Sequence, residues 1–106
     1  MREETFEILY DPEVRGHLRR IDRKHHRLMR QMIEDRLSCE PQMETRNRKP
    51  LTRPSLWEYV WELRFGPDNR FRVFYQTDPG SGTVHVVAIG EKREDRLHIG
   101  GEEFEL

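Results

Sequence analysis

The sequence predicts an α+β fold, in which an N-terminal strand and two helices, or one kinked helix, precede a three-stranded antiparallel meander packed against the helices. Three observations support this fold class. The stretch 56–92 contains three apolar-alternating runs separated by two turn clusters, as in a meander. Apolar residues recur every three or four positions over residues 12–37, as on one face of a helix. A length of 106 residues is typical of one domain, so residues 1–106 are expected to form a single unit.

The first strand and the start of the helical region are predicted by residues 5–12. Apolar side chains alternate with others from Thr5 to Tyr10, which indicates a short strand. Asp11 directly before Pro12 is typical of a helix start, with aspartate as the N-cap and proline at the first helical position. We therefore expect a helix to begin at Pro12.

The helical region that follows is either a hairpin of two helices or one kinked helix. Gly16 weakens a single rod, and Asp22 is suited to cap a second helix. We expect the apolar stripe of this region to pack on the aromatic face of the sheet. His25 and His26 are expected at the edge of the stripe and are assigned no functional role. The stripe consists of Val14, Leu18, Ile21, Leu28, Met29, Met32, Ile33 and Leu37.

Two runs of the central stretch direct their apolar side chains to one face of a sheet. The odd positions from 57 to 65 and from 71 to 75 are all apolar, and a period of two is that of a β-strand. One face is therefore expected to be core. The other is expected to be basic and mixed, and it carries Glu62, Arg64, Arg70 and Arg72.

The turn between these runs, residues 67–69, is expected to be a three-residue loop. In such a loop Pro67 and Asp68 form a type I turn and Asn69 has a positive φ. This register sets Arg64 opposite Arg72. Like charges directly across a strand pair are destabilising, so the pair needs solvent, a carboxylate such as Glu62, or a bound anion. A solvated sheet face and a phosphate site both stay open as explanations.

The third run, residues 83–90, shows little alternation, which is typical of a central strand buried on both faces. His85 is expected at its rim. Gly100 and Gly101 then interrupt the chain before an acidic tail, in which residues 103–106 are expected to add a short edge strand.

The segment 38–54 shows no periodic pattern and contains three prolines. A loop of this length is usually functional or mobile, and a solvated linker is the alternative. Its basic residues are Arg46, Arg48, Lys49 and Arg53.

Composition limits the classes of function. With 34% hydrophobic and 37% charged residues, the core is expected to be small and to depend on aromatic side chains. The net charge is -1, yet residues 11–75 are basic and both ends are acidic, which is compatible with nucleic acid binding but is weak evidence for it.

Cys39 is the only cysteine, so we expect no disulfide and a reducing cytoplasmic location. The five histidines lack zinc-binding spacing, so no metal or cofactor is expected. No apolar run is long enough for a membrane span or a signal peptide.

Four short motifs follow one another in the order of these elements: Lys49-Pro50-Leu51, Trp61-Glu62-Leu63-Arg64, Phe71-Arg72-Val73-Phe74-Tyr75 and Ala88-Ile89-Gly90. Together they resemble the RelE/ParE superfamily of type II toxin–antitoxin toxins over roughly residues 5–98. The resemblance implies a small α+β toxin with a cognate antitoxin as its partner. In the RelE branch it further implies binding in the ribosomal A site and metal-independent cleavage of mRNA, in which a substrate 2′-OH attacks its own 3′ phosphate.

For such a nuclease, the resemblance assigns chemical roles that need a base, an acid and cationic stabilisation of the phosphorane. Arg72 corresponds to the strand arginine that stabilises the phosphate, Lys92 or Arg93 to the basic segment after the last strand, and His98 to the acid. Glu62 and Lys49 are the candidates for the base. The catalytic set is thus Arg72, His98, Arg93 and Glu62, and the phosphate-binding set is Arg64, Lys49, Arg46, Arg48, Arg70 and Lys92.

Two departures from the family pattern support a second hypothesis. RelE-type relatives carry lysines on the strand where this chain has Glu62 and Leu63, and other nucleases end in His or Tyr where this chain has Phe104-Glu105-Leu106. The missing lysines favour a non-enzymatic protein of the ParE kind, which poisons DNA gyrase by protein contact. The basic loop and His98 place the ribosome-dependent endoribonuclease first. In both hypotheses the antitoxin is expected to grip the sheet face or the helices with an acidic or amphipathic segment.

Overall fold

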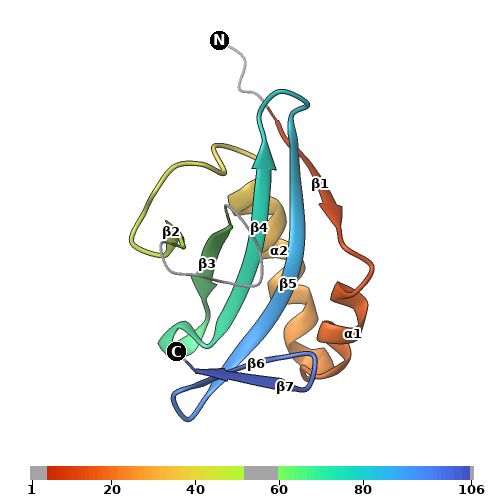
Figure 1. Cartoon of the computed structure of the whole chain (residues 1–106), viewed down its shortest axis with the longest axis vertical. Coiled ribbons are helices and arrows are strands. Elements are labelled where there is room, and N and C mark those ends of the chain that lie inside the picture. Colours follow the sequence, from red (N-terminus) through yellow and green to blue (C-terminus); the bar gives the residue numbers. More distant parts are fainter. Residues whose placement is uncertain (1–4, 52–59, 106) are drawn as a thin grey trace.

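The computed structural model describes residues 5–51 and 60–105 and confirms the α+β class (Figure 1). Within these two ranges the sheet contains seven strands in the order β2-β3-β4-β5-β6-β7, with β1 beside β5, so it extends beyond the predicted meander. The elements are β1 (Glu7–Tyr10), α1 (Val14–Arg19), the 3₁₀ turn η1 (Arg23–His25), α2 (His26–Leu37), β2 (Arg48–Pro50), β3 (Trp61–Phe65), the 3₁₀ turn η2 (Pro67–Asn69), β4 (Phe71–Asp78), β5 (Thr83–Arg93), β6 (Arg96–Ile99) and β7 (Glu102–Glu105).

The helical region is a hairpin of two helices, each preceded by an aspartate. Helix α1 begins at Val14, two residues later than predicted. Asp11 still closes the turn before it, because its Oδ1 accepts a hydrogen bond from the Glu13 N–H at 3.0 Å. Asp22 caps η1 as predicted, accepting from the Lys24 N–H at 3.0 Å, and this bond lowers the pKa of its carboxyl group. The chain therefore breaks at Asp22 instead of forming one kinked rod.

His26 joins the two helices, a role that its position in the sequence does not predict. Its Nε2 lies 2.9 Å from the carbonyl oxygens of both Leu18 and Ile21. These carbonyls belong to the end of α1 and the segment after it, and the Leu18 carbonyl oxygen also accepts from the Ile21 N–H at 3.0 Å. The ring of His25 packs on Phe71 with its centroid at 4.9 Å, which agrees with the expected stripe-edge position.

The predicted register of the central hairpin is confirmed, but the predicted turn type is wrong. Arg64 pairs with Arg72 across β3 and β4. In the turn, Asp68 has φ 55° and Asn69 has φ 53°, whereas a type I turn requires a negative φ at Asp68. Short polar side chains tolerate this left-handed region, so two consecutive residues adopt it without changing the loop length.

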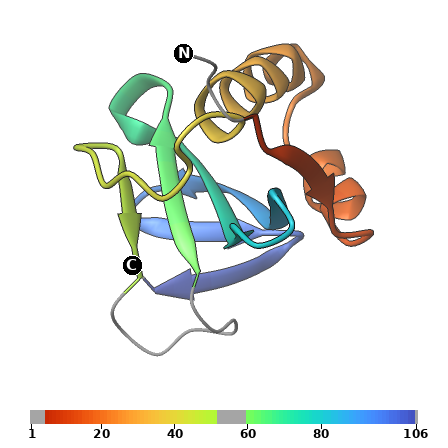
Figure 2. The same ribbon diagram turned by 90° about the horizontal axis from the view of Figure 1, so that it is seen from above.

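The principal core lies between the helices and the odd-numbered face of β3 and β4, as predicted. The helices lie on one side of the sheet in Figure 2. Trp57 and Tyr59, which the alternation predicts on the same face, lie outside the described residues. The buried members are Val14, Ile21, Met29, Ile33, Leu37, Leu63, Phe65, Phe71, Val73, Tyr75, Val84, Val86 and Ile89.

The opposite face of the sheet is not simply basic, because a second, smaller core lies there. The hairpin of β6 and β7 folds back over this face (Figure 2) and covers it with apolar side chains. Gly90 permits the close approach, since a Cβ at this position would lie 2.9 Å from the carbonyl oxygen of His98. The buried members are Val60, Phe74, Val87, Ala88, Leu97 and Ile99.

Strand β5 is central and buried on both faces, as predicted. It pairs with β4 along one side, and its other side pairs first with β1 and then with β6. Between these partners the Ile89 N–H donates a hydrogen bond to His17 Nδ1 at 3.3 Å. Burial lowers the pKa of His17, which is consistent with a neutral ring that accepts this bond. Strand β7 confirms the edge strand expected in the acidic tail, except for Leu106, which lies outside the described residues.

Candidate functional site

Glu62 lies between the two arginines that face each other across β3 and β4. Its Oε1 accepts from Arg64 Nε at 2.7 Å, and its Oε2 accepts from Arg72 Nη1 at 3.3 Å. Of the three ways to relieve the repulsion between Arg64 and Arg72, the fold uses the carboxylate. We call this group of three residues the Glu62 clamp.

Arg72 is placed unfavourably for the phosphate-stabilising role that the resemblance assigns to it. The residue is 5% exposed and Glu62 is 6% exposed. Arg72 Nε also donates to the Asn69 carbonyl oxygen at 3.0 Å. Burial lowers the pKa of Arg72 while Glu62 opposes that shift. Two donor nitrogens of Arg72 thus have partners inside the protein, and Glu62 is engaged by two cations instead of being free to act as a base.

The described basic residues of the loop differ in their exposure to solvent. Arg48, a predicted phosphate ligand, is 8% exposed and donates to the carbonyl oxygens of Arg36 at 2.6 Å and Met43 at 2.8 Å. Through these two bonds Arg48 closes the end of α2 and holds the loop. Arg46 and Lys49 are exposed, and Arg53 lies outside the described residues.

Tyr75, on β4, holds the same loop through a hydrogen bond. Its hydroxyl donates to the Pro41 carbonyl oxygen at 2.7 Å, and burial raises the pKa of the phenol. The segment after α2 is therefore held by Tyr75 and Arg48 and is not a free linker.

A second carboxylate, Glu91, organises the remaining predicted arginines at the far end of β5. Its Oε2 accepts from Arg70 Nε at 2.5 Å, and its Oε1 accepts from Arg93 Nη2 at 2.9 Å. Glu91 is 2% exposed. Burial would raise the pKa of its carboxyl group, but the hydrogen bonds from Arg93 and Arg70 outweigh burial and lower it. We call this group the Glu91 clamp. The sequence analysis did not single out Glu91. Its position directly after the buried apolar run of β5 could have indicated a buried carboxylate that needs cationic partners.

His98 lies close to the Glu91 clamp and not to the Glu62 clamp. It pairs with Glu91 across β5 and β6, so the two side chains project from the same side of the ladder. Its Nε2 is 3.9 Å from Glu103 Oε1. Arg72 instead pairs with Gly90, one position before Glu91, so it projects from the opposite side. The structure therefore divides the predicted catalytic set between two clamps.

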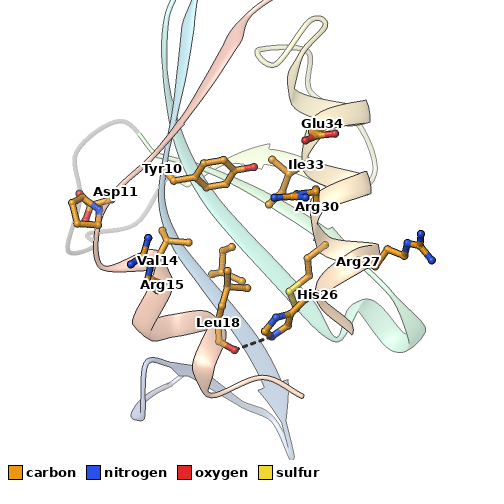
Figure 3. Close-up of a pocket in the computed structure, with 13 residues that line it drawn as sticks. Tyr10, Asp11, Val14, Arg15, Leu18, His26, Arg27, Arg30, Ile33 and Glu34 are labelled. Carbon is orange, nitrogen blue, oxygen red and sulfur yellow. Dashed lines mark hydrogen bonds between the residues drawn. The ribbon is translucent and has the colours of Figure 1, made fainter. Parts of the chain in front are cut away.

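A pocket of about 1050 Å³ opens between the first strand and the two helices (Figure 3). Tyr10 extends from β1 towards Ile33 on α2, and Val14 and Leu18 line the side of α1. We call it the α1–α2 pocket. Its apolar floor is bordered by cationic residues, with Asp11 and Glu34 as the acidic exceptions; the arginines are Arg15, Arg27 and Arg30.

The part of the chain that the structure describes offers neither a metal cluster nor a membrane-crossing helix. Residues 5–51 and 60–105 contain no group of three or more His, Cys, Asp or Glu side chains arranged to hold a metal ion. Neither α1 nor α2 has the length and apolar character that a membrane-crossing helix requires.

The two-helix layer, the mostly antiparallel sheet and the arginine-bearing strands agree with the RelE/ParE class of toxins. A chain of the toxin–antitoxin complex RelBE2 from Mycobacterium tuberculosis has the same fold, with a TM-score of 0.68 and 20% identity over 86% of this chain and 95% of that chain. A comparison with curated protein sequences finds no significant match. The family model described as the ParE toxin of the type II toxin–antitoxin system parDE matches residues 8–96. The chain belongs to this ParE toxin family.

Proposed function

We propose that this type II toxin acts by binding a protein target, with DNA gyrase as the target that the ParE kind implies, and that it does not cleave RNA. A cytoplasmic location is part of the proposal. The observation that carries it is the buried ion pair of Arg72 and Glu62, 3.3 Å apart. A phosphate stabiliser must meet the developing charge with free donors, and a base must be able to take up a proton. Both groups are neutralised by each other within the fold.

The division of the predicted site gives independent support. Catalysis of phosphoryl transfer by positioned side chains requires them to surround one reacting phosphate. Arg72 and Arg64 belong to the Glu62 clamp, whereas Arg93 lies in the Glu91 clamp with His98 across the ladder. A protein-binding toxin needs no such convergence.

A ribosome-dependent endoribonuclease is the second candidate, and one observation favours it. Arg93 and His98 lie on the same side of the hairpin of β5 and β6, and the Arg93 side chain is 53% exposed. A cation and a titratable ring therefore lie near each other without help from Arg72.

The deciding experiment uses the purified toxin in two parallel reactions. In the first, gyrase supercoils a relaxed plasmid with increasing toxin. In the second, primer extension reports the integrity of a message on translating ribosomes. We expect loss of supercoiling and an intact message. Cleavage between codons with undisturbed supercoiling would overturn the proposal and select the nuclease.

We further propose that the cognate antitoxin binds in the α1–α2 pocket through an amphipathic segment with acidic flanks. Apolar side chains of such a segment fit the floor formed by Val14, Leu18 and Ile33, and its acidic side chains complement the arginines at the border. Recognition of a groove by alternating apolar anchors and flanking charges is a common mode of peptide binding.

The antitoxin encoded beside the toxin gene supplies the test. Charge reversal by Arg27→Glu with Arg30→Glu should weaken its binding by at least tenfold in calorimetry, because like charges then meet across the interface. Arg36→Glu, an exposed change on the same helix outside the pocket, is the matched control. Equal affinities for both variants would place the antitoxin elsewhere.

A further inference from the structure

We infer that His17 is a proton-operated latch between α1 and β5. The neutral ring holds α1 against β5 and keeps the α1–α2 pocket in its binding shape, and the protonated ring releases α1 and weakens binding in the pocket. The consequence for the antitoxin rests on the proposed function, which places that partner in the pocket. The latch itself rests on contacts of His17 with β5 and with the turn between β6 and β7.

The first contact of His17 spans a gap along one edge of β5. On this edge β1 pairs with β5 as far as Val86, and β6 pairs with it from Glu91 onward. Between these two residues the Ile89 N–H donates a hydrogen bond to His17 Nδ1 at 3.3 Å. The imidazole thus takes the place of a neighbouring strand, and it ties α1 to the centre of the sheet.

The second contact of His17 fixes another edge of the ring. Gly100 lies in the turn between β6 and β7 with φ 59°, and a Cβ at this position would lie 2.8 Å from His17 Cδ2 and 3.5 Å from Nε2. The ring is therefore held between the Ile89 N–H and the backbone of Gly100. While α1 stays in place, a ring packed this closely has little room to turn away from Ile89.

Protonation of His17 is incompatible with its bond to Ile89. Because Nδ1 accepts that bond, the neutral ring carries its proton on Nε2, whereas an imidazolium carries a proton on each nitrogen. A proton on Nδ1 would face the Ile89 N–H, and Ile89 is 1% exposed, so solvent does not readily take over the donor. Burial lowers the pKa of His17, which favours the neutral, latched form near pH 7.

The charged groups around His17 offer the protonated ring a different set of contacts. The ring borders a cavity of about 670 Å³ between α1 and the β6–β7 hairpin. The carboxylates at this cavity attract an imidazolium, as does Asp11 before α1, whereas the arginines repel it. From β5 it is the Ile89 N–H that faces the ring. Protonation therefore exchanges a contact with the sheet for contacts with carboxylates. The ionisable groups lining the cavity beside His17 are Glu13, Arg19, Arg20 and Glu102.

The latch acts on the α1–α2 pocket because the two elements that it joins both line that pocket. Ile89 of β5 lines it together with Val14 and Leu18, which belong to the same short helix as His17 (Figure 3). If α1 moves away from β5, the apolar lining that these three residues share comes apart. A pocket ligand that contacts both elements favours the latched form, and a proton favours the released form. Each therefore weakens the binding of the other by the same factor.

NMR spectroscopy of the full-length toxin without antitoxin tests the latch itself. A titration from pH 8 to pH 5 follows the ring nitrogens of His17, the Ile89 amide and the methyl groups of Val14 and Leu18. We expect all of these signals to shift with one midpoint, below the ordinary histidine value of about 6.5. In His17→Asn the amide and methyl signals should show no such transition, because an amide oxygen accepts a hydrogen bond and does not titrate.

Two outcomes of the titration would overturn the inference. One is a ring that becomes protonated while the Ile89 amide and the methyl groups of Val14 and Leu18 stay unchanged. The other is a ring that stays neutral over the whole range. Both are read from the wild-type protein, so they decide even if His17→Asn fails to fold.

Calorimetry with the antitoxin encoded beside the toxin gene tests the consequence for binding. The contribution of His17 should be fully present above about pH 6.5 and be lost as the pH falls through the pKa of the folded protein. From pH 7.5 to pH 5.5 the wild type should lose at least about threefold more affinity than His17→Asn, a comparison in which titration of the antitoxin itself cancels. His85→Asn changes another histidine, on β5, whose side chain is 45% exposed, and should behave as the wild type.

The two experiments separate the latch from the proposed antitoxin site. Parallel pH dependence of affinity in the wild type and His17→Asn would overturn the coupling between the latch and binding. If charge reversal at Arg27 and Arg30 places the antitoxin outside the pocket, the proposed site fails. The methyl shifts of Val14 and Leu18 then still decide whether protonation of His17 reshapes the pocket.

Discussion

Glu62 and Arg72 form an ion pair inside the protein, with 3.3 Å between Oε2 and Nη1 and with both side chains at least nine-tenths buried. Breaking a buried pair by removing one partner leaves an uncompensated charge and typically costs about 3–5 kcal/mol. Arg72 is the residue to which the family resemblance assigns phosphate stabilisation. In this chain its buried ion pair gives it a structural role. Loss of toxicity in Arg72→Ala would therefore not by itself demonstrate catalysis.

The first prediction concerns the coupling of this pair. Arg72→Gln and Glu62→Gln should each lower the free energy of unfolding by about 3 kcal/mol, and the double variant should lose less than the sum, with a coupling of at least about 1 kcal/mol. Urea unfolding measures all three. Arg64→Gln, whose side chain is 43% exposed, should cost less than about 1 kcal/mol. Additive single effects would contradict a direct interaction.

The second prediction contrasts two glycines. Gly90→Ala places a Cβ 2.9 Å from the His98 carbonyl oxygen and 2.9 Å from Ile99 Cγ1, so β6 must shift and the protein should lose about 1–3 kcal/mol. Gly16 lies within α1, where an added methyl group would meet no described atom of another element within 4 Å. Gly16→Ala should stabilise the protein by up to about 1 kcal/mol. Thermal unfolding of the two variants checks both signs.

The third prediction is a pH dependence that arises from His17. Burial lowers its pKa in the folded state, so the unfolded state binds more protons between the folded pKa and the ordinary value near 6.5. Stability should therefore fall as the pH decreases below about 6.5, because protonation removes the Nδ1 acceptor of the Ile89 N–H. The acidic groups Glu13, Asp11 and Glu102 partly oppose the shift.

His17→Asn is the matched variant for that prediction, since an amide oxygen can replace Nδ1 as an acceptor and does not titrate. Urea unfolding from pH 5 to pH 8 should show a smaller loss of stability on acidification in His17→Asn than in the wild type. Parallel curves for the two proteins would assign the pH dependence to other groups.

The fourth prediction separates two arginines of the basic loop that sequence reasoning grouped together. Arg48→Met keeps the volume of the side chain but leaves the carbonyl oxygens of Arg36 and Met43 without their donor, and it should cost about 1–3 kcal/mol. Arg46→Met, at an exposed position, should change stability by no more than about 0.5 kcal/mol. Chemical unfolding distinguishes the two, and similar losses would show that the loop is held by other contacts.

Much of the fold was predictable because its signals are local. The alternation of apolar residues placed Leu63, Phe65 and Val73 on one core face, and the loop length set Arg64 opposite Arg72. Asp22 marked the break between the helices. The second core was missed because its members Leu97 and Ile99 reach Phe74 only when the hairpin of β6 and β7 folds back over the sheet. No local sequence pattern predicts that hairpin's position.

The site was predictable in its residue types and not in its arrangement. The sequence alone predicted the first strand, the two helices, the central meander, the family, and the presence of arginines on neighbouring strands. Which carboxylate each arginine meets depends on three-dimensional packing, which buries Glu62 beside Arg72 and Glu91 beside Arg70 and Arg93. Ion pairing depends on distances of a few ångströms between side chains that are far apart in the chain. A charge that packing removes from water also needs a partner of opposite charge nearby, because burying it unpaired is costly.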